Sequence, residues 1–325
     1  MNDLRKTVMV ILSSQSSDLE VSTAVEKLDK ENSDFSNSFL AYYYDSIGDI
    51  EITESYLSKI KDMKKLEELA LKDANLAFSI ALLHGVGLFF EENITEMLKF
   101  LEISSKGGNP LADLELGYYS LEQETSEEEL MDSITHFENA ISKGLYEGYL
   151  SIAEIYMELN DFTEARKYFN LAIDNGLDGY LGLSVIELEL KHKFKTEEFL
   201  LKSYKMKPTK DTTFLLGGFY LDIKKSIDRA LPYFEESDSL GSEEASFALG
   251  LIYYLGEEIK QDLGKSFNYF SKAAHKGELG AIFYIGLFYF DGIFVEKNEE
   301  EGLKWLEIAA DSGDEDAIEF LSNLE

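Results

Sequence analysis

The sequence predicts an all-α fold in which about eight pairs of helices repeat along the chain, followed by a half-unit. The C-terminal third repeats itself at a 36-residue step. Small and apolar residues recur at helical spacing inside each unit. Only 3 of the 325 residues are Pro, which suits long helical stretches because an interior Pro costs a helix about 3 kcal/mol.

The 36-residue step can be read directly from the last units of the chain. Ala245, Ala281 and Ala317 are 36 residues apart. The same step separates four further pairs: Gly250 and Gly286, Tyr253 and Tyr289, Gly256 and Gly292, and Gly277 and Gly313. Such self-similarity is typical of repeat proteins, in which each unit buries its core against its neighbours.

Each repeated residue type has a physical role. Within a unit, Ala, Leu or Ile, Gly and Tyr occupy relative positions 0, 4, 5 and 8, which share one face of a helix. The small residues on this face allow a second helix to approach closely. Gly256 and Gly292 follow at the point where the first helix ends and a positive φ is needed. We therefore expect second helices to begin near Asp262 and Asn298.

The pattern continues upstream with less regularity. Residues 216–241 form a shorter unit, and residues 144–176 form a unit that has no Gly after Tyr156. Residues 36–71 are interpreted as a first, divergent unit, because terminal units must tolerate water on one side.

The predicted domain organisation has two parts. An N-terminal helical cap or arm occupies residues 1–35, and a repeat solenoid occupies residues 36–325. The best-formed repeats lie in 210–325.

The phrase A-x3-LG-x2-Y-x2-G, followed by a helix ending in AA-x2-G, resembles the Sel-one-like repeat family, a relative of the tetratricopeptide repeat. The similarity is strong over about 210–325, moderate over about 72–176 and weak elsewhere. The resemblance implies antiparallel helix pairs stacked into a right-handed superhelix with a concave face. It also implies an adaptor or scaffold role in binding other proteins; in bacteria, such proteins include immunity proteins that neutralise toxins.

The resemblance further implies which residues meet a partner, because the first helix of each pair lines the groove in related superhelices. Carried onto this sequence, the partner-binding residues form an aromatic and aliphatic stripe: Phe214, Leu221, Phe247, Leu251, Tyr254, Phe283, Leu287 and Phe290. Gly218 occupies one further position of the stripe. Exposed apolar patches mark interaction sites, and aromatic residues anchor interfaces. The alternative is that a stripe at helical spacing belongs to the core.

The formal net charge of −33 comes from 63 acidic and 30 basic residues. It disfavours binding to nucleic acid or to an anionic membrane, because both need clustered Lys and Arg. A basic protein partner would be attracted; the alternative is that the acidity only keeps the surface soluble. Three acidic stretches are candidates for steering such a partner: Glu122–Glu129, Glu299–Glu301 and Asp314–Asp316.

Neither catalysis nor a cofactor is predicted. The four His residues are at least 52 residues apart and form no metal-binding spacing. The run from Gly264 to Ser266 lacks the upstream Gly of a phosphate-binding loop, since position 259 is Ile259. The chain has no Cys, no secretory signal and no membrane-spanning run, so we expect a cytoplasmic protein.

Two functions remain after these exclusions. The leading interpretation is a non-catalytic protein–protein interaction scaffold that binds a partner through its concave groove. Within it, the narrower hypothesis is an immunity protein that neutralises a basic toxin. The alternative is a structural or regulatory adaptor subunit of a larger assembly.

Overall fold

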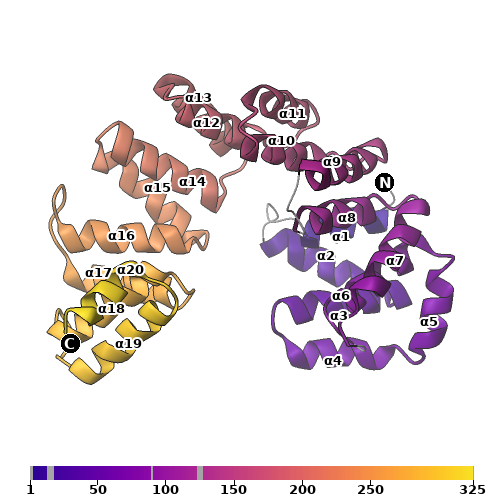
Figure 1. Cartoon of the computed structure of the whole chain (residues 1–325), viewed down its shortest axis with the longest axis horizontal. Helices are drawn as coiled ribbons and strands as arrows, with labels where there is room; N and C mark the ends of the chain where they lie inside the picture. Colours follow the sequence, from indigo (N-terminus) through magenta and orange to yellow (C-terminus); the bar gives the residue numbers. More distant parts are fainter. Residues whose placement is uncertain (1–2, 13–17, 89–90, 123–126, 325) are drawn as a thin grey trace. The chain divides into compact units, whose positions relative to one another are not determined.

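The structure, a computed structural model, describes residues 3–12, 18–88, 91–122 and 127–324. Every secondary-structure element in this part of the chain is a helix, and consecutive helices pack in pairs (Figure 1). The predicted all-α repeat fold is therefore confirmed. The chain divides into two compact units, Met1–Gly179 and Tyr180–Glu325, and each is described by itself.

The first unit contains four successive helix pairs: α3 with α4, α6 with α7, α8 with α9, and α10 with α11. α1 and α2 pack on each other, and the short α5 packs on α6. The bounds of these helices are α1 Asp3–Leu12, α2 Asp18–Glu31, α3 Asp34–Ser46, α4 Ile50–Lys59, α5 Met63–Ala70, α6 Ala74–Gly85, α7 Ile94–Lys106, α8 Pro110–Glu122, α9 Glu127–Ser142, α10 Gly148–Glu158 and α11 Phe162–Asp174.

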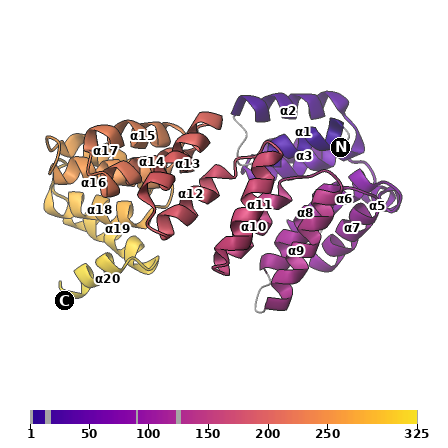
Figure 2. The same cartoon turned by 90° about the horizontal axis from the view of Figure 1, so that it is seen from above.

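The second unit contains four more pairs, in which α12 to α19 are taken two at a time, and α20 follows as a half-unit (Figure 2). Its helices are α12 Tyr180–Glu189, α13 Lys193–Met206, α14 Lys210–Gly218, the π-helix η1 Phe219–Ile223, α15 Ile227–Ser239, α16 Glu243–Leu255, α17 Leu263–Ala274, α18 Leu279–Asp291, α19 Glu299–Asp311 and α20 Glu315–Ser322. Among the described residues the two units thus hold eight repeat pairs, which is the number the sequence predicts.

The helix ends lie where the repeated residues place them. Asp262 caps α17, since its side chain accepts a hydrogen bond from the backbone N–H of Lys265, and Asn298 caps α19 in the same way. Gly256 and Gly292 end α16 and α18 with φ of 63° and 74°. A side chain at these φ values would be strained, so the expected role of both glycines is confirmed.

The pair α14–α15 is shorter than its neighbours, and the difference is located in the connection. Seventeen residues separate Gly217 from Phe234, whereas 20 separate Gly250 from Phe270. The chain passes directly from α14 into the π-helix η1, which is followed by Lys225 at φ 51° in place of a glycine. A π-helix is rare and occurs mostly as a single turn continuous with an α-helix, as it does here.

The pair α10–α11 lacks the glycine after Tyr156, and another residue supplies the positive φ at the end of its first helix. Asn160 adopts φ 56°, and Asn tolerates this left-handed region better than other non-glycine residues. Asp161 then caps α11 by accepting hydrogen bonds from the N–H groups of Thr163 and Glu164. The connection therefore needs only three residues between the helices.

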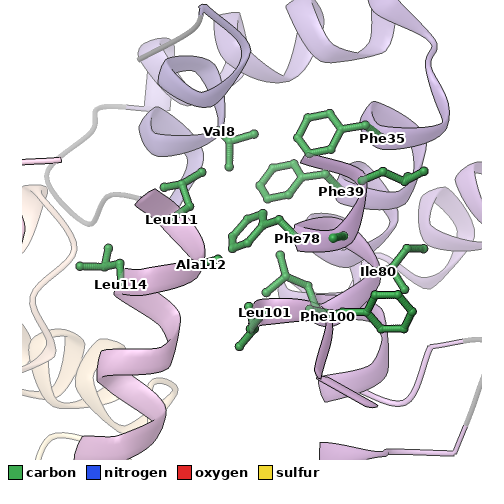
Figure 3. Close-up of a cluster of buried hydrophobic side chains, with 14 of the residues drawn as sticks. Val8, Phe35, Phe39, Phe78, Ile80, Phe100, Leu101, Leu111, Ala112 and Leu114 are labelled. Carbon is green, nitrogen blue, oxygen red and sulfur yellow. The ribbon is translucent and has the colours of Figure 1, made fainter. Parts of the chain in front are cut away.

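The core of the first unit includes its N-terminal helix. Val8 of α1 is fully buried in the same apolar cluster as Phe39 of α3 and Phe78 of α6 (Figure 3). Arg5, also on α1, donates a hydrogen bond from Nε to Asn75 Oδ1 at 2.8 Å. α1 thus packs directly on the repeat helices. The division into a cap, residues 1–35, and a repeat solenoid, residues 36–325, stays a prediction.

One contact recurs inside the helix pairs: a glycine of the first helix lies against a large side chain of the second. A Cβ atom at these glycines would lie far inside van der Waals contact: 2.5 Å from Phe137 at Gly117, 2.7 Å from Phe234 at Gly217, 2.6 Å from Phe270 at Gly250 and 2.7 Å from Leu306 at Gly286. The missing Cβ is therefore what allows the two helices of a pair to pack this closely.

Two adjacent glycines should respond to the same substitution with opposite signs. Gly217→Ala inserts a methyl group into the Phe234 ring and should destabilise the protein by about 1–3 kcal/mol through overpacking. Gly218 has helical φ and ψ and open space where its Cβ would be, so Gly218→Ala should stabilise it by about 0.5–1 kcal/mol. Urea unfolding of both variants measures the two changes in stability, and equal changes would contradict the difference in packing at Gly217 and Gly218.

Candidate partner-binding surface

The eight residues of the predicted stripe lie on three successive first helices of the second unit. Phe214 is on α14 and Leu221 on η1; the next three are on α16, and the last three are on α18. All eight are half-buried, so none is fully accessible and none belongs to the fully buried core. Each side chain therefore has a packed part and a part open to solvent.

The aromatic members of the stripe join one helix pair to the next. The Phe247 ring centroid lies 5.7 Å from that of Phe270 in its own pair and 6.2 Å from that of Tyr284 in the next. Tyr254 lies 5.3 Å from Tyr284 and 5.9 Å from Phe288. These ring contacts hold neighbouring helix pairs together. The stripe therefore takes part in packing, which was the alternative interpretation, and its role in binding stays a prediction.

The last aromatic residues of the stripe contact the half-unit. Phe283 and Phe290 of α18 meet the Phe320 ring of α20 edge-on, at 6.4 and 5.4 Å between centroids. Edge-to-face contacts of this kind add to the energy of area burial. α20 is thereby fixed on α18 as well as on α19.

Two hollows flank the π-helix η1 at the beginning of the stripe. The α14 hollow has a volume of about 260 Å³ and is lined by Leu188, Phe214 and Gly218 among others. The α16 hollow has a volume of about 250 Å³ and is lined by Leu221, Leu255 and neighbouring side chains. Two predicted partner-binding residues, Phe214 and Leu221, thus lie in the walls of cavities large enough for a side chain of another protein.

Charge around the α16 hollow is predominantly negative. Asp222, Glu257 and Glu258 line it together with a single ammonium group, that of Lys225. None of the three carboxylates forms an ion pair within the described part of the chain. Asp222 also lines the α14 hollow, so one carboxylate lies between the two cavities.

Sequence reasoning missed several residues of these hollows. Leu188 and Leu255 are 38% and 55% exposed, and Asp222 lies on the π-helix. The signal for Leu255 was its place immediately before Gly256, at the open end of a first helix. No comparable signal marked Asp222, because its position depends on a π-helix that the helical period does not predict.

A second candidate surface is a group of glutamates on α8 and α10 in the first unit. Glu115 and Glu122 lie seven residues apart on α8, and Glu154 and Glu158 lie one turn apart on α10. Tyr118 joins the two helices, since its hydroxyl lies 3.1 Å from Ser151 Oγ. We call these four carboxylates, none of which has an ion-pair partner in the described residues, the glutamate face.

The environment of the glutamate face disfavours its negative charge. Burial, and then repulsion from Glu122, raises the pKa of Glu115 to about 7. Burial, and then repulsion from Glu158, raises the pKa of Glu154. A carboxylate held in this way gains more from a neighbouring cation than an exposed one does.

The three acidic stretches predicted as steering sites have local roles as well. Asp314 caps α20, and Glu299–Glu301 form the first turn of α19, where negative charge is favoured by the helix dipole. Lys304 pairs with Glu300 at 2.9 Å. Of the stretch Glu122–Glu129, residues 123–126 lie outside the described residues. The steering role itself stays a prediction.

Positive charge gathers around α13 in an otherwise acidic chain. Residues 191–210 contain seven Lys and only two acidic residues, Glu197 and Glu198. Phe194, at the start of α13, is 86% exposed among these lysines. The second unit therefore carries a basic helix, which we call the α13 face, and acidic hollows.

Paired helices, αL glycines at the first helix ends and a recurring glycine–ring contact define an all-α repeat protein of the tetratricopeptide-like class. Within that class, the model of the Sel1 repeat matches residues 156–177, 243–278 and 280–314. The chain therefore contains Sel1 repeats, and the resemblance to the Sel-one-like repeat is confirmed. No curated protein matches the chain.

Solved structures share the fold. A Sel1 repeat protein from Oxalobacter formigenes is similar over 100% of this chain and 95% of its own, with 17% identity and a TM-score of 0.62. Yeast Tom70 is similar over 99% of this chain and 64% of its own, with 14% identity and a TM-score of 0.59. The protective antigen c5321 of uropathogenic Escherichia coli, which displays the same repeat fold, gives 20% identity and a TM-score of 0.54 over 82% of this chain. The chain spans only 59% of that antigen's length.

None of the described helices combines the length and the apolar composition that crossing a bilayer requires.

The raised pKa of Glu115 predicts a pH-dependent loss of stability. A group whose pKa is higher in the folded state stabilises the fold below its unfolded pKa, and this contribution is lost as the pH rises through about 7. Glu115→Gln should therefore be more stable than the parent at pH 8, by roughly 1–3 kcal/mol, and nearly equal to it at pH 4. Urea unfolding at both pH values tests this, with exposed Glu138→Gln as the control; an equal gain for both variants would contradict it.

Proposed function

We propose that this protein is a non-catalytic scaffold that binds a basic protein partner along the stripe of its second unit. The observation that carries the proposal is the pair of apolar hollows on either side of η1, with unpaired carboxylates at Asp222, Glu257 and Glu258. Apolar side chains of a partner would fill the hollows, and its Lys or Arg residues would meet the carboxylates. Interfaces are commonly built this way, with a buried apolar anchor and a polar rim.

The proposal extends to the role of the interaction. A charge of −33 attracts a basic protein over several ångströms and raises the rate of association. We propose that the protein sequesters its partner in the cytoplasm, as an immunity protein neutralising a basic toxin would. The repeat fold supports a scaffold, the charge supports a basic partner, and the absence of Cys is compatible with the reducing compartment.

The choice of variants follows from the packing of the stripe. Truncating Phe247 or Tyr254 would loosen the contact between helix pairs, so lost binding could reflect lost folding. Leu188 and Leu255 are better targets, because each lines a hollow while its side chain is substantially exposed. Leu240, 46% exposed in the same unit and outside both hollows, provides a matched control.

We expect the double variant Leu188→Arg/Leu255→Arg to weaken partner binding at least about tenfold, roughly 1.4 kcal/mol, because arginines would block the hollows and repel a basic partner. Leu240→Arg should bind as the parent does. The measurement is isothermal titration with the product of the neighbouring gene at low and at physiological salt. Absence of binding at low salt would refute the sequestering role, and equal binding by the two variants would exclude the hollows.

An adaptor role in a larger assembly is the second candidate, favoured by one observation. α20 buries only Ala317 fully and leaves Ile318 about half exposed, so this helix offers an apolar edge to another chain. Sedimentation velocity over a range of concentrations separates the candidates. A monomer at every concentration would argue against self-assembly through α20.

A further inference from the structure

A cavity of about 930 Å³ lies in the first unit, remote in sequence from the stripe, where α2 ends, α3 begins and the α4–α5 connection passes. Its volume lies within the range of small-molecule sites. Unlike most such sites, it is lined largely by polar side chains, among them four of the chain's lysines. It has no place in the function proposed above.

Asn37 is the buried polar group of this cavity. It lies on α3, is 5% exposed and forms part of the cavity wall. Its Nδ2 donates a hydrogen bond to Asn32 Oδ1 at 3.2 Å, whereas its Oδ1 is buried with no hydrogen-bond partner. A buried amide oxygen left in this state is unfavourable, and the usual explanation is a bound water or a ligand that donates to it.

The cations of the cavity divide into two kinds. Two of the four have partners: Lys30 pairs with Glu26 at 3.3 Å, and Lys59 Nζ lies 3.5 Å from Asp29 and 3.9 Å from the centre of the Tyr56 ring. Lys61 and Lys65 line the same cavity but have no ion-pair partner within the described part of the chain. Both side chains are exposed at the cavity, so their ammonium groups are open to a ligand.

The aspartates of the cavity do not neutralise these two lysines. Asp29 accepts a hydrogen bond from the Tyr56 hydroxyl at 2.8 Å in addition to its contact with Lys59. Asp62 caps α5 by accepting from the backbone N–H of Lys65. Asp34 has no partner and Asp62 has only this capping bond, so two cations and two anions of the cavity are without an ion pair in the described residues.

We propose that this cavity binds a small molecule that carries an oxyanion, a carboxylate or a phosphate, together with a hydroxyl or amide donor. The oxyanion lies between the Lys61 and Lys65 ammonium groups, and the donor satisfies Asn37 Oδ1. A second donor on the ligand can reach Asp34 at the rim. This ligand pairs the charges that the protein leaves unpaired and supplies the one hydrogen bond that the buried amide lacks.

The test is isothermal titration of the whole protein, at constant ionic strength, with two probes. Citrate presents carboxylates and a hydroxyl, and glycerol 3-phosphate presents a phosphate and hydroxyls, so the two arms distinguish the sources of the oxyanion. We expect saturable binding of at least one probe. No saturable binding of either probe up to about 10 mM, a very weak affinity for a site with three polar contacts, would overturn the proposal.

Variants locate the binding. Lys61→Gln/Lys65→Gln should weaken it at least about tenfold, whereas Lys64→Gln should leave it unchanged, because Lys64 is adjacent in sequence, exposed and outside the cavity lining. Equal losses in both would show a non-specific effect of charge and overturn the site. Asn37→Leu keeps the number and branching of the side-chain heavy atoms, removes the amide and should also weaken binding at least about tenfold. If Asn37→Leu binds the probe as the parent does, the amide holds only a bridging water and the proposal fails.

Discussion

A glycine of the first helix lies against a large side chain of the second in the pairs α8–α9, α14–α15, α16–α17 and α18–α19, and this contact sets the distance between the two helices. Other residues of the same first helix then reach the neighbouring pair, as Phe247 and Tyr254 of α16 do. The stripe is therefore a product of the core packing. A substitution in the stripe therefore also changes the contacts between neighbouring helix pairs.

Much of this architecture follows from residues whose effect is local. Asp262 and Asn298 cap helices, and Gly256 and Gly292 end them, because each acts on the backbone within one turn of itself. The helix pairs and their number could be predicted from the sequence for this reason. The π-helix could not, since it arises from a connection three residues shorter and depends on how α14 and α15 must still meet.

The candidate site was only partly predictable, because net charge does not say which carboxylates remain unpaired. The acidic runs that stand out in the sequence serve largely as caps and first helical turns, as Asp314 and Glu300 show. The carboxylates in unusual surroundings are single residues such as Glu115 and Asp222. Glu115 is desolvated by burial, and Asp222 lies between two hollows lined by other helices, and neither environment is known until the helices are stacked.

The α13 face gives the second unit an uneven distribution of charge. Seven lysines on and around one helix, in a chain of net charge −33, separate positive from negative charge within one compact unit. Such a body has a permanent electric dipole moment, which exerts a torque on any charged molecule that approaches it. The basic partner proposed above would be turned before contact, so that productive encounters would be selected by orientation as well as by attraction.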